Sequence, residues 1–198
     1  SIQRLVDKAM ADGQPGIAIT DHGDMFGIKE FYNYVKKVKG KLKDKAADCE
    51  KRLEELRGGE AGAAEIADCE KQLAELKRKL AFKPIIGCEV YVARRRLHDK
   101  EGKPDQSGYH LILLAKNLKG YHNLIKIVSK AWTEGFYMRP RTDRVEIEKY
   151  HEGLICCSAC LAGEVPRAIT ADDMEKAEES ILWHKRVFGD DYYLELQL

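Results

Sequence analysis

Four side chains of this sequence suit metal binding and lie in unusual positions. Asp21 and His22 come at the end of the apolar run IAIT. Imidazole and carboxylate at the end of a strand suit a metal site or general acid–base chemistry. A helix N-cap or a surface pair is the ordinary explanation of an Asp and a His in a turn, so this motif alone is a weak signal. Glu89 interrupts the run IIGC–VYV, where a buried carboxylate needs a cation or hydrogen-bond donors.

Two further candidates accompany them. His110 lies at the head of HLILLA, and Cys160 follows the strand-like GLICCS. A thiolate at such a strand exit is a good zinc ligand, softer than the nitrogen and oxygen donors around it. Each candidate also has a structural explanation: Glu89 could face solvent by strand alternation, and His110 could be a satisfied core histidine. The other four histidines lie in charged segments and are interpreted as non-functional.

The six cysteines do not form a zinc-finger or secreted-disulfide pattern. Cys157 and Cys160 form one CxxC, which is weak without a second pair. The ordinary interpretation of each cysteine is a reduced thiol used as a small apolar residue. The composition is 44% hydrophobic and 34% charged with a net charge of +1, which argues against the whole chain acting as an electrostatic nucleic-acid binder. A local basic patch could still bind one.

The elements that must position these residues alternate between strand and helix. Apolar stretches predict strands, and amphipathic stretches between them predict helices. The predicted strands are 15–20, 83–93, 109–116, 153–158 and 192–198, and the predicted helices cover 1–12, 27–39, 118–132, 162–170 and 172–188. Short links between them favour a parallel α/β architecture, and strands apolar on both faces favour a barrel over an open sheet. No apolar run is long enough to span a membrane.

Residues 41–81 depart from this pattern because they contain an internal repeat. ADCEKRLEEL at 47–56 returns as ADCEKQLAEL at 67–76, with GGEAG between the two halves. The apolar residues follow steps of three and four, which predicts a helical seam and an inserted antiparallel hairpin. Folding the hairpin about residue 60 places Cys49 opposite Cys69, as a thiol pair or as an oxidised bridge. The hairpin is either a tolerated surface insertion or a docking arm.

The ordered set of motifs resembles a known family. TDHGDMFGIKEFY, KPIIGCEVYVA, YHLILLAKNLKGYHNLIKIVSKAW, EGFYMRPRTD, GLICCSACLAGEVPRAI and FGDDYYLELQ together are similar to the PHP domain of bacterial DNA polymerase III alpha subunits. The resemblance covers nearly the whole chain, 1–198, except the 41–81 hairpin. It implies a distorted (β/α)7 barrel, incomplete here at both ends, with up to three divalent metal ions that hydrolyse phosphoesters.

Carried over position by position, the resemblance implies metal-ligand roles for His22, Glu89, His110 and Cys160. Glu89, His110 and Cys160 would share one metal ion at a site with an open position, which suits zinc. The family's first strand, with its H-x-H motif, and a later Asp-x-His pair are expected to lie outside this chain. His22 would therefore lack its co-ligands, and no complete trinuclear site is expected.

The implied parent is a cytoplasmic replicative DNA polymerase, with DNA and a proofreading exonuclease subunit among its partners and no membrane contact. The domain would act as a 3′–5′ proofreading exonuclease or as a scaffold, and the fragment alone would have no polymerase activity. Arg139, Arg141 and Arg144 in YMRPRTDR could contact phosphate; a solvated loop with ordinary ion pairs is the alternative. A stand-alone phosphoesterase of the histidinol-phosphatase type and a purely structural interaction module are the rival interpretations.

Overall fold

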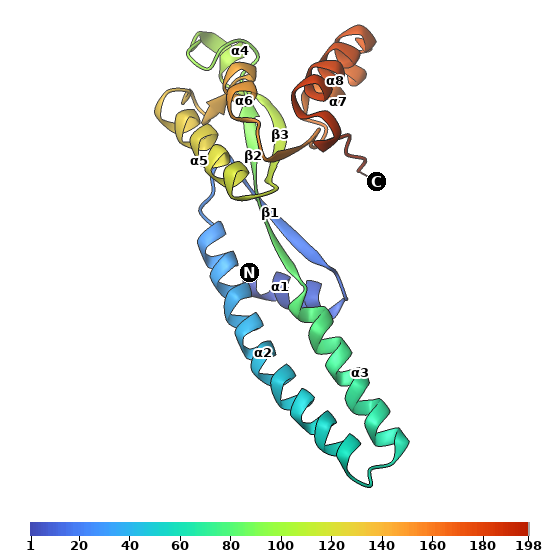
Figure 1. Cartoon of the computed structure of the whole chain (residues 1–198). Coiled ribbons are helices and arrows are strands. Elements are labelled where there is room, and N and C mark those ends of the chain that lie inside the picture. Colours follow the sequence, from blue (N-terminus) through green and yellow to red (C-terminus); the bar gives the residue numbers. More distant parts are fainter. Residues whose placement is uncertain (198) are drawn as a thin grey trace. The chain divides into compact units, whose positions relative to one another are not determined.

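The computed structural model describes residues 1–197 and divides into two compact units (Figure 1). One unit combines Ser1–Ile17 with Gly27–Ile85, and the other combines Ala18–Phe26 with the chain from Ile86 onward. Strands β1 (Gly16–His22) and β2 (Lys83–Val92) contribute residues to both. No helix in the described part of the chain is long and apolar enough to cross a membrane.

The first unit is dominated by two long helices. Helix α1 (Ile2–Ala11) precedes α2 (Ile28–Gly58) and α3 (Ala63–Leu80). The facing sides of α2 and α3 bury a small apolar core made of Ala46, Leu53, Cys69 and Leu73. The ion pairs Arg57–Glu70 and Lys77–Glu50 connect the two helices. The earlier residue of α2, Glu50, pairs with the later residue of α3, Lys77. The two helices therefore run antiparallel.

The predicted pairing of the two repeat cysteines is confirmed. The Sγ atoms of Cys49 and Cys69 lie 3.6 Å apart, and both thiols are free. Helix α2, however, runs without a break from Ile28, whereas the sequence predicted a helix ending near residue 39. Gly40 does not end it, because an isolated glycine inside a helix is tolerated at a modest cost. The interpretation of residues 41–81 as a separate inserted hairpin stays a prediction.

The second unit is built on a mixed sheet. The strand order is β1-β2-β3-β5-β6, with β4 beside β2. The remaining strands are β3 (Tyr109–Ala115), β4 (Arg141–Thr142), β5 (Leu154–Cys157) and β6 (Tyr192–Tyr193). The helices are α4 (Gly102–Asp105), α5 (Leu118–Thr133), α6 (Arg144–Tyr150), α7 (Glu164–Thr170) and α8 (Met174–Phe188), followed by the 3₁₀ turn Gly189–Asp191.

The expected all-parallel arrangement is wrong. β2 pairs antiparallel with β3, and β3 pairs antiparallel with β5, while β2–β4 and β5–β6 are parallel. The link from β2 to β3 holds only the one-turn helix α4, so it lacks the crossover helix of a βαβ unit. Among the described residues the sheet is not closed. The predicted closing strand is also shorter than expected, and Leu198 lies outside the described residues.

One face of this sheet carries the main core. Cys88, Val90 and Val92 of β2 pack with Leu111 and Leu113 of β3 in a buried cluster. Helices α5 and α8 complete that cluster with Leu124, Ile127, Trp183 and Phe188. Because successive side chains of a strand point to opposite faces, the residues between these core positions lie on the other face. Those residues include Glu89 and His110.

Candidate metal centre

Strand pairing brings Glu89 and His110 onto one face of the sheet. In the register of β2 and β3, Glu89 pairs with Ile112 and Tyr91 pairs with His110. Glu89 and His110 are therefore diagonal neighbours across the two strands, within reach of each other. The Glu89 side chain is 10% exposed and that of His110 is 24% exposed. The site thus lies at the edge of the protein interior, where ligands are held firmly yet remain accessible.

A tight loop after β5 places Cys160 beside this pair. The amide of His110 donates to the carbonyl of Ala162, and the amide of Gly163 donates to the carbonyl of Cys160 at 2.8 Å. A Cβ at Gly163 would lie 2.3 Å from the carbonyl oxygen of Ser158, so only glycine fits there. Ala159 adopts the left-handed conformation at φ 62°. The loop backbone is therefore fixed against β3 itself.

The three ligand atoms form a compact group. Glu89, His110 and Cys160 each offer one atom, and these atoms all lie within 4.8 Å of one another. Sγ of Cys160 lies 3.6 Å from Nδ1 of His110, and His110 Nδ1 contacts Oε1 of Glu89. Tetrahedral zinc with bonds of about 2.0–2.3 Å separates its ligands by roughly 3.4–3.7 Å. The Cys160–His110 separation falls in this range, and thiolate, imidazole and carboxylate are donor types that can hold a divalent metal ion.

The carboxylate of Glu89 provides a further sign. Its Oε1 atom is buried and forms no hydrogen bond among the described residues, although it contacts Nδ1 of His110. A buried carboxylate oxygen without a donor is costly unless a cation stands nearby. A metal ion held by the three side chains would supply that cation. This buried oxygen, which contacts an imidazole without a hydrogen bond, therefore fits a metal site.

His22 contacts the same carboxylate from the other side. Its Nδ1 atom lies 2.7 Å from Oε2 of Glu89, and its side chain is 70% exposed. The backbone amide of the next residue, Gly23, donates to the carbonyl of Glu89 at 2.8 Å. His22 is therefore adjacent to the three-residue group without belonging to its compact set of ligand atoms. The metal roles of all four residues stay predictions.

Neighbouring cysteines are not alternative ligands. Cys88 and Cys156 are completely buried in the core on the opposite face of the sheet. Burial raises the pKa of Cys88 to about 12 and raises the pKa of Cys156 well above its ordinary value. Both thiols therefore stay protonated and uncharged at neutral pH, which makes them poor metal ligands. Among the described cysteines, Cys160 is the one that belongs to a group of three potential metal-ligating side chains.

The three arginines predicted to contact phosphate differ in position. Arg139 is exposed and lies over the ring of Tyr91. Arg144 bonds to Glu164 and Glu179, so its charge is already paired. Arg141 is fully buried, and its guanidinium donates to backbone carbonyls of the same unit. Arg141 is therefore not placed to contact a phosphate, because its guanidinium is buried and its Nε and Nη2 atoms donate to backbone carbonyls. Contacts by Arg139 and Arg144 stay predictions.

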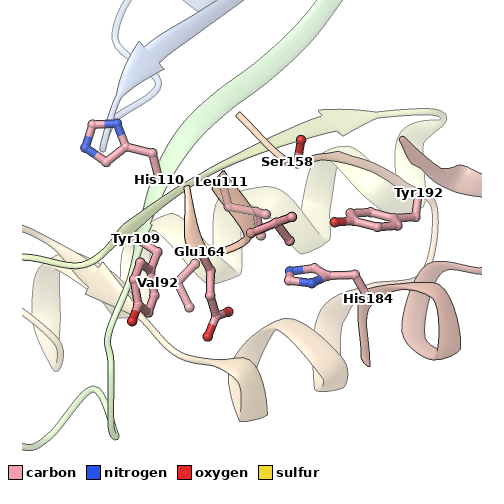
Figure 2. Close-up of a pocket in the computed structure, with 9 residues that line it drawn as sticks. Val92, Tyr109, His110, Leu111, Ser158, Glu164, His184 and Tyr192 are labelled. Carbon is pink, nitrogen blue, oxygen red and sulfur yellow. The ribbon is translucent and has the colours of Figure 1, made fainter. Parts of the chain in front are cut away.

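A small pocket adjoins the metal-binding group (Figure 2). The rings of His184 and Tyr192 stack on one side of it, whereas His110 lies apart from them (Figure 2). The cavity measures about 10 Å³, which is the size that holds about one water molecule. The buried Tyr192 hydroxyl has no hydrogen-bond partner among the described residues, and burial raises its pKa. Such a cavity is too small for a substrate and fits a structural water.

Sequence reasoning missed one neighbour of the site. The ring of Tyr91 meets the ring of His110 edge to face, with centroids 5.2 Å apart. This contact restricts the orientation of the His110 imidazole. This neighbour could have been predicted from the sequence. Tyr91 lies two residues after Glu89 in one strand, so the two side chains share a face of the sheet.

Comparison with known proteins defines the class. The sequence profile of the PHP domain family matches residues 1–198. The chain therefore belongs to the PHP domain family.

Among relatives, the chain is 40% identical over 197 residues to the DNA polymerase III subunit alpha of Borreliella burgdorferi, covering 99% of this chain and 14% of that protein. It is 35% identical over 199 residues to the protein of the same name from Chlamydia muridarum, covering 100% and 13%. It is also 35% identical over 185 residues to that of Thermus aquaticus, covering 92% and 12%. The chain thus spans only about one seventh of the length of these relatives.

Proposed function

We propose that this chain is the N-terminal PHP domain of a bacterial DNA polymerase III alpha subunit and that Glu89, His110 and Cys160 hold one divalent metal ion. The compact group of three ligand atoms, all within 4.8 Å, carries the proposal. The donor set of one thiolate, one imidazole and one carboxylate favours zinc. Three protein ligands leave a fourth position open for water or substrate, as in catalytic zinc sites.

The activity that this arrangement supports is phosphoester hydrolysis. A metal ion at such a site polarises the phosphate and lowers the pKa of a bound water. Glu89 orients both histidines, because one of its oxygens contacts His110 and the other contacts His22. His22, at the exposed end of β1, would serve a second metal position in the intact domain. There the sheet would close into the distorted (β/α)7 barrel, with 41–81 as an inserted arm.

The biological setting follows from the polymerase-named relatives. In the parent protein, a DNA-directed DNA polymerase in the bacterial cytoplasm, the domain would act on DNA. It would either hydrolyse a mispaired 3′ end or support a separate proofreading exonuclease subunit within the replicase. The names of the relatives favour this setting over a stand-alone phosphoesterase of the histidinol-phosphatase type.

Metal analysis of the purified 198-residue chain tests the proposal. We expect about one zinc ion per chain after equilibration with zinc and gel filtration, measured by plasma mass spectrometry. Cys160→Ser removes the thiolate and should weaken zinc binding by roughly 10-fold or more. Cys157→Ser is the matched control, because Cys157 is half-buried on β5 and outside the group of ligand atoms.

The outcomes separate cleanly. Zinc lost in Cys160→Ser and kept in Cys157→Ser supports the proposed ligand set. Equal zinc content in all three proteins would place the metal elsewhere. Absence of zinc, manganese and iron from the wild-type chain after equilibration with each would contradict the metal centre itself.

A further inference from the structure

Two aromatic rings at the end of α5 form an exposed stack. The rings of Trp132 and Phe136 are nearly parallel, with an interplanar angle of 22° and centroids 5.5 Å apart. Trp132 is 44% exposed and Phe136 is 46% exposed, although the hydrophobic effect favours burial of both rings. A stacked pair that remains half open to solvent offers aromatic surface to a further planar group.

The stack is held in place by buried polar contacts. The indole Nε1 of Trp132 donates to the carbonyl of Gly23 at 2.8 Å. The turn before Phe136 is tight, because a Cβ at Gly135 would lie 1.9 Å from the carbonyl oxygen of Arg141. The buried guanidinium of Arg141 in turn donates to the carbonyl of Gly135 at 3.1 Å. The fully buried arginine therefore braces the turn that presents Phe136, and the platform is preorganised.

Direct contacts connect this platform to the candidate metal centre. Gly23, which receives the Trp132 hydrogen bond, follows His22 and donates to the backbone of Glu89. On the same side, the guanidinium of Arg139 lies 5.4 Å from the ring centre of Tyr91 and donates to its hydroxyl. The Tyr91 ring meets His110. The aromatic stack and the Arg139 guanidinium are thus each connected to the candidate metal centre by a few direct contacts.

Two cations near the platform in sequence, Lys130 and Arg139, differ in their partners. Lys130, on the same helix as Trp132, is paired with Glu146 and Glu134. Arg139 forms no ion pair with a carboxylate among the described residues. Its guanidinium, which donates one hydrogen bond to the Tyr91 hydroxyl, has further N–H donors for a phosphate oxygen. Aromatic faces that stack bases, combined with a cation for the backbone, are the pattern of single-stranded nucleic-acid binding.

We infer that Trp132 and Phe136 form a stacking platform for the unpaired terminal bases of a single DNA strand. Arg139 binds a phosphate of that strand, which directs the terminal phosphodiester toward Glu89, His110 and Cys160. This inference rests on the proposed function and narrows its substrate to an end that is frayed or single-stranded. A fully paired end presents no free base face to the stack and is disfavoured.

Tryptophan fluorescence provides the test, because the chain has only two tryptophans. Trp183 is buried, so the Trp183→Phe protein reports on Trp132 alone. Single-stranded oligothymidylate, added without metal, should quench this emission saturably, whereas a blunt hairpin duplex should not. Phe136→Ala should weaken oligonucleotide binding by roughly 5- to 100-fold. Where Trp183→Phe does not fold, the difference between wild type and Trp132→Phe gives the same signal.

A matched control uses another exposed aromatic residue. Tyr193 is 53% exposed on β6, at the opposite edge of the sheet from β1, and Tyr193→Leu should leave oligonucleotide binding unchanged. Unchanged Trp132 emission would overturn the inference and assign the stack to a protein contact. Equal quenching by the duplex, or full affinity in Phe136→Ala, would also overturn it. The titration is free of metal, so it tests the platform separately from the metal centre. Quenching in a chain that binds no zinc would contradict the proposed metal centre and support the platform. Zinc binding without quenching would contradict the platform and support the metal centre.

Discussion

Two cysteine neighbourhoods of this chain have the same spacing and different chemistry. In the α2–α3 seam, the Sγ atoms of Cys49 and Cys69 lie 3.6 Å apart. At the sheet, Sγ of Cys160 lies 3.6 Å from Nδ1 of His110. The seam surrounds its thiols with leucine and alanine side chains, whereas Cys160 has a histidine and a buried carboxylate beside it. The neighbours of a thiol, and not its distance to the next polar atom, decide what it can do.

Electrostatics sharpens the contrast. Burial raises the pKa of Cys69, and its hydrogen bond with Cys49 raises it further, so this thiol stays protonated at neutral pH. A metal ligand must instead be a thiolate. The seam pair is therefore a packing feature, and the sheet face is where charge is concentrated. The same division, with solvated charges in one unit and buried charges in the other, leads to four predictions.

The largest effect is expected from a buried charge of the sheet unit. The carboxylate of Asp143 accepts hydrogen bonds from Arg96 and from the amides of Leu97 and Glu146. Asp143→Ala removes a helix N-cap and leaves the buried Leu97 amide unpaired, which should lower the free energy of unfolding by about 2–4 kcal/mol. Urea denaturation measures this. Asp48→Ala, at a solvated position on α2, is the control and should change it by less than about 0.5 kcal/mol.

The pH dependence of that effect has a definite sign. Burial opposes the ionisation of Asp143, but hydrogen bonds from Arg96 and two backbone amides outweigh it and lower the pKa. The stabilisation is therefore complete above the unfolded-state pKa of about 3.9 and is lost as the pH falls through the lower folded-state pKa. The gap between wild type and Asp143→Ala should narrow in strong acid. A constant gap from pH 7 to pH 2 would refute this account of the charge.

Zinc should stabilise one region and not the other. At a free concentration 100 times the dissociation constant, a ligand that binds only the folded state adds about 2.7 kcal/mol. We expect slower hydrogen exchange at amides of β2 and β3 on zinc addition, reversed by a chelator, with no change at amides of the α2–α3 seam. Equal protection of both regions would mean that the metal does not distinguish the two cysteine neighbourhoods.

A smaller loss is expected from the apolar seam. Leu53 is 7% exposed between α2 and α3, and Leu53→Ala should cost about 2 kcal/mol of local stability. Hydrogen exchange of the two helices measures this loss. Zinc binding by the same variant should be unchanged. A variant that loses zinc affinity together with helix protection would contradict the independence of the seam from the metal-binding group.

The seam could be predicted from the sequence because it is a local pattern. The repeat and its heptad spacing determine which residues face each other, so Cys49 and Cys69 could be matched from the sequence alone. The strands that carry Glu89 and His110 were likewise predictable. Each residue lies within or at the head of a short apolar run, and such runs are typical of buried strands. The continuous length of α2 was not, since an isolated glycine such as Gly40 weakens a helix only modestly and does not have to end it.

Non-local features were harder to predict. The antiparallel pairing of β2 with β3 depends on contacts between distant segments, and a list of strand positions does not determine strand direction. Arg141 was interpreted as a surface cation because arginine is rarely buried, yet the carbonyls of Gly135, Leu97 and Asp99 hold it in the interior. The closeness of Cys160 to His110 was implied by family resemblance, and the sequence contains no local signal for it.

X-ray absorption spectroscopy of the zinc-loaded chain tests the central claim most directly. We expect one sulfur ligand, from Cys160, at about 2.3 Å from zinc. We also expect a nitrogen ligand from His110 and an oxygen ligand from Glu89 at about 2.0–2.2 Å. Two sulfur ligands would point to the Cys49–Cys69 pair, and a sulfur-free spectrum would exclude Cys160. Either result would contradict the assignment of the metal centre to this face of the sheet.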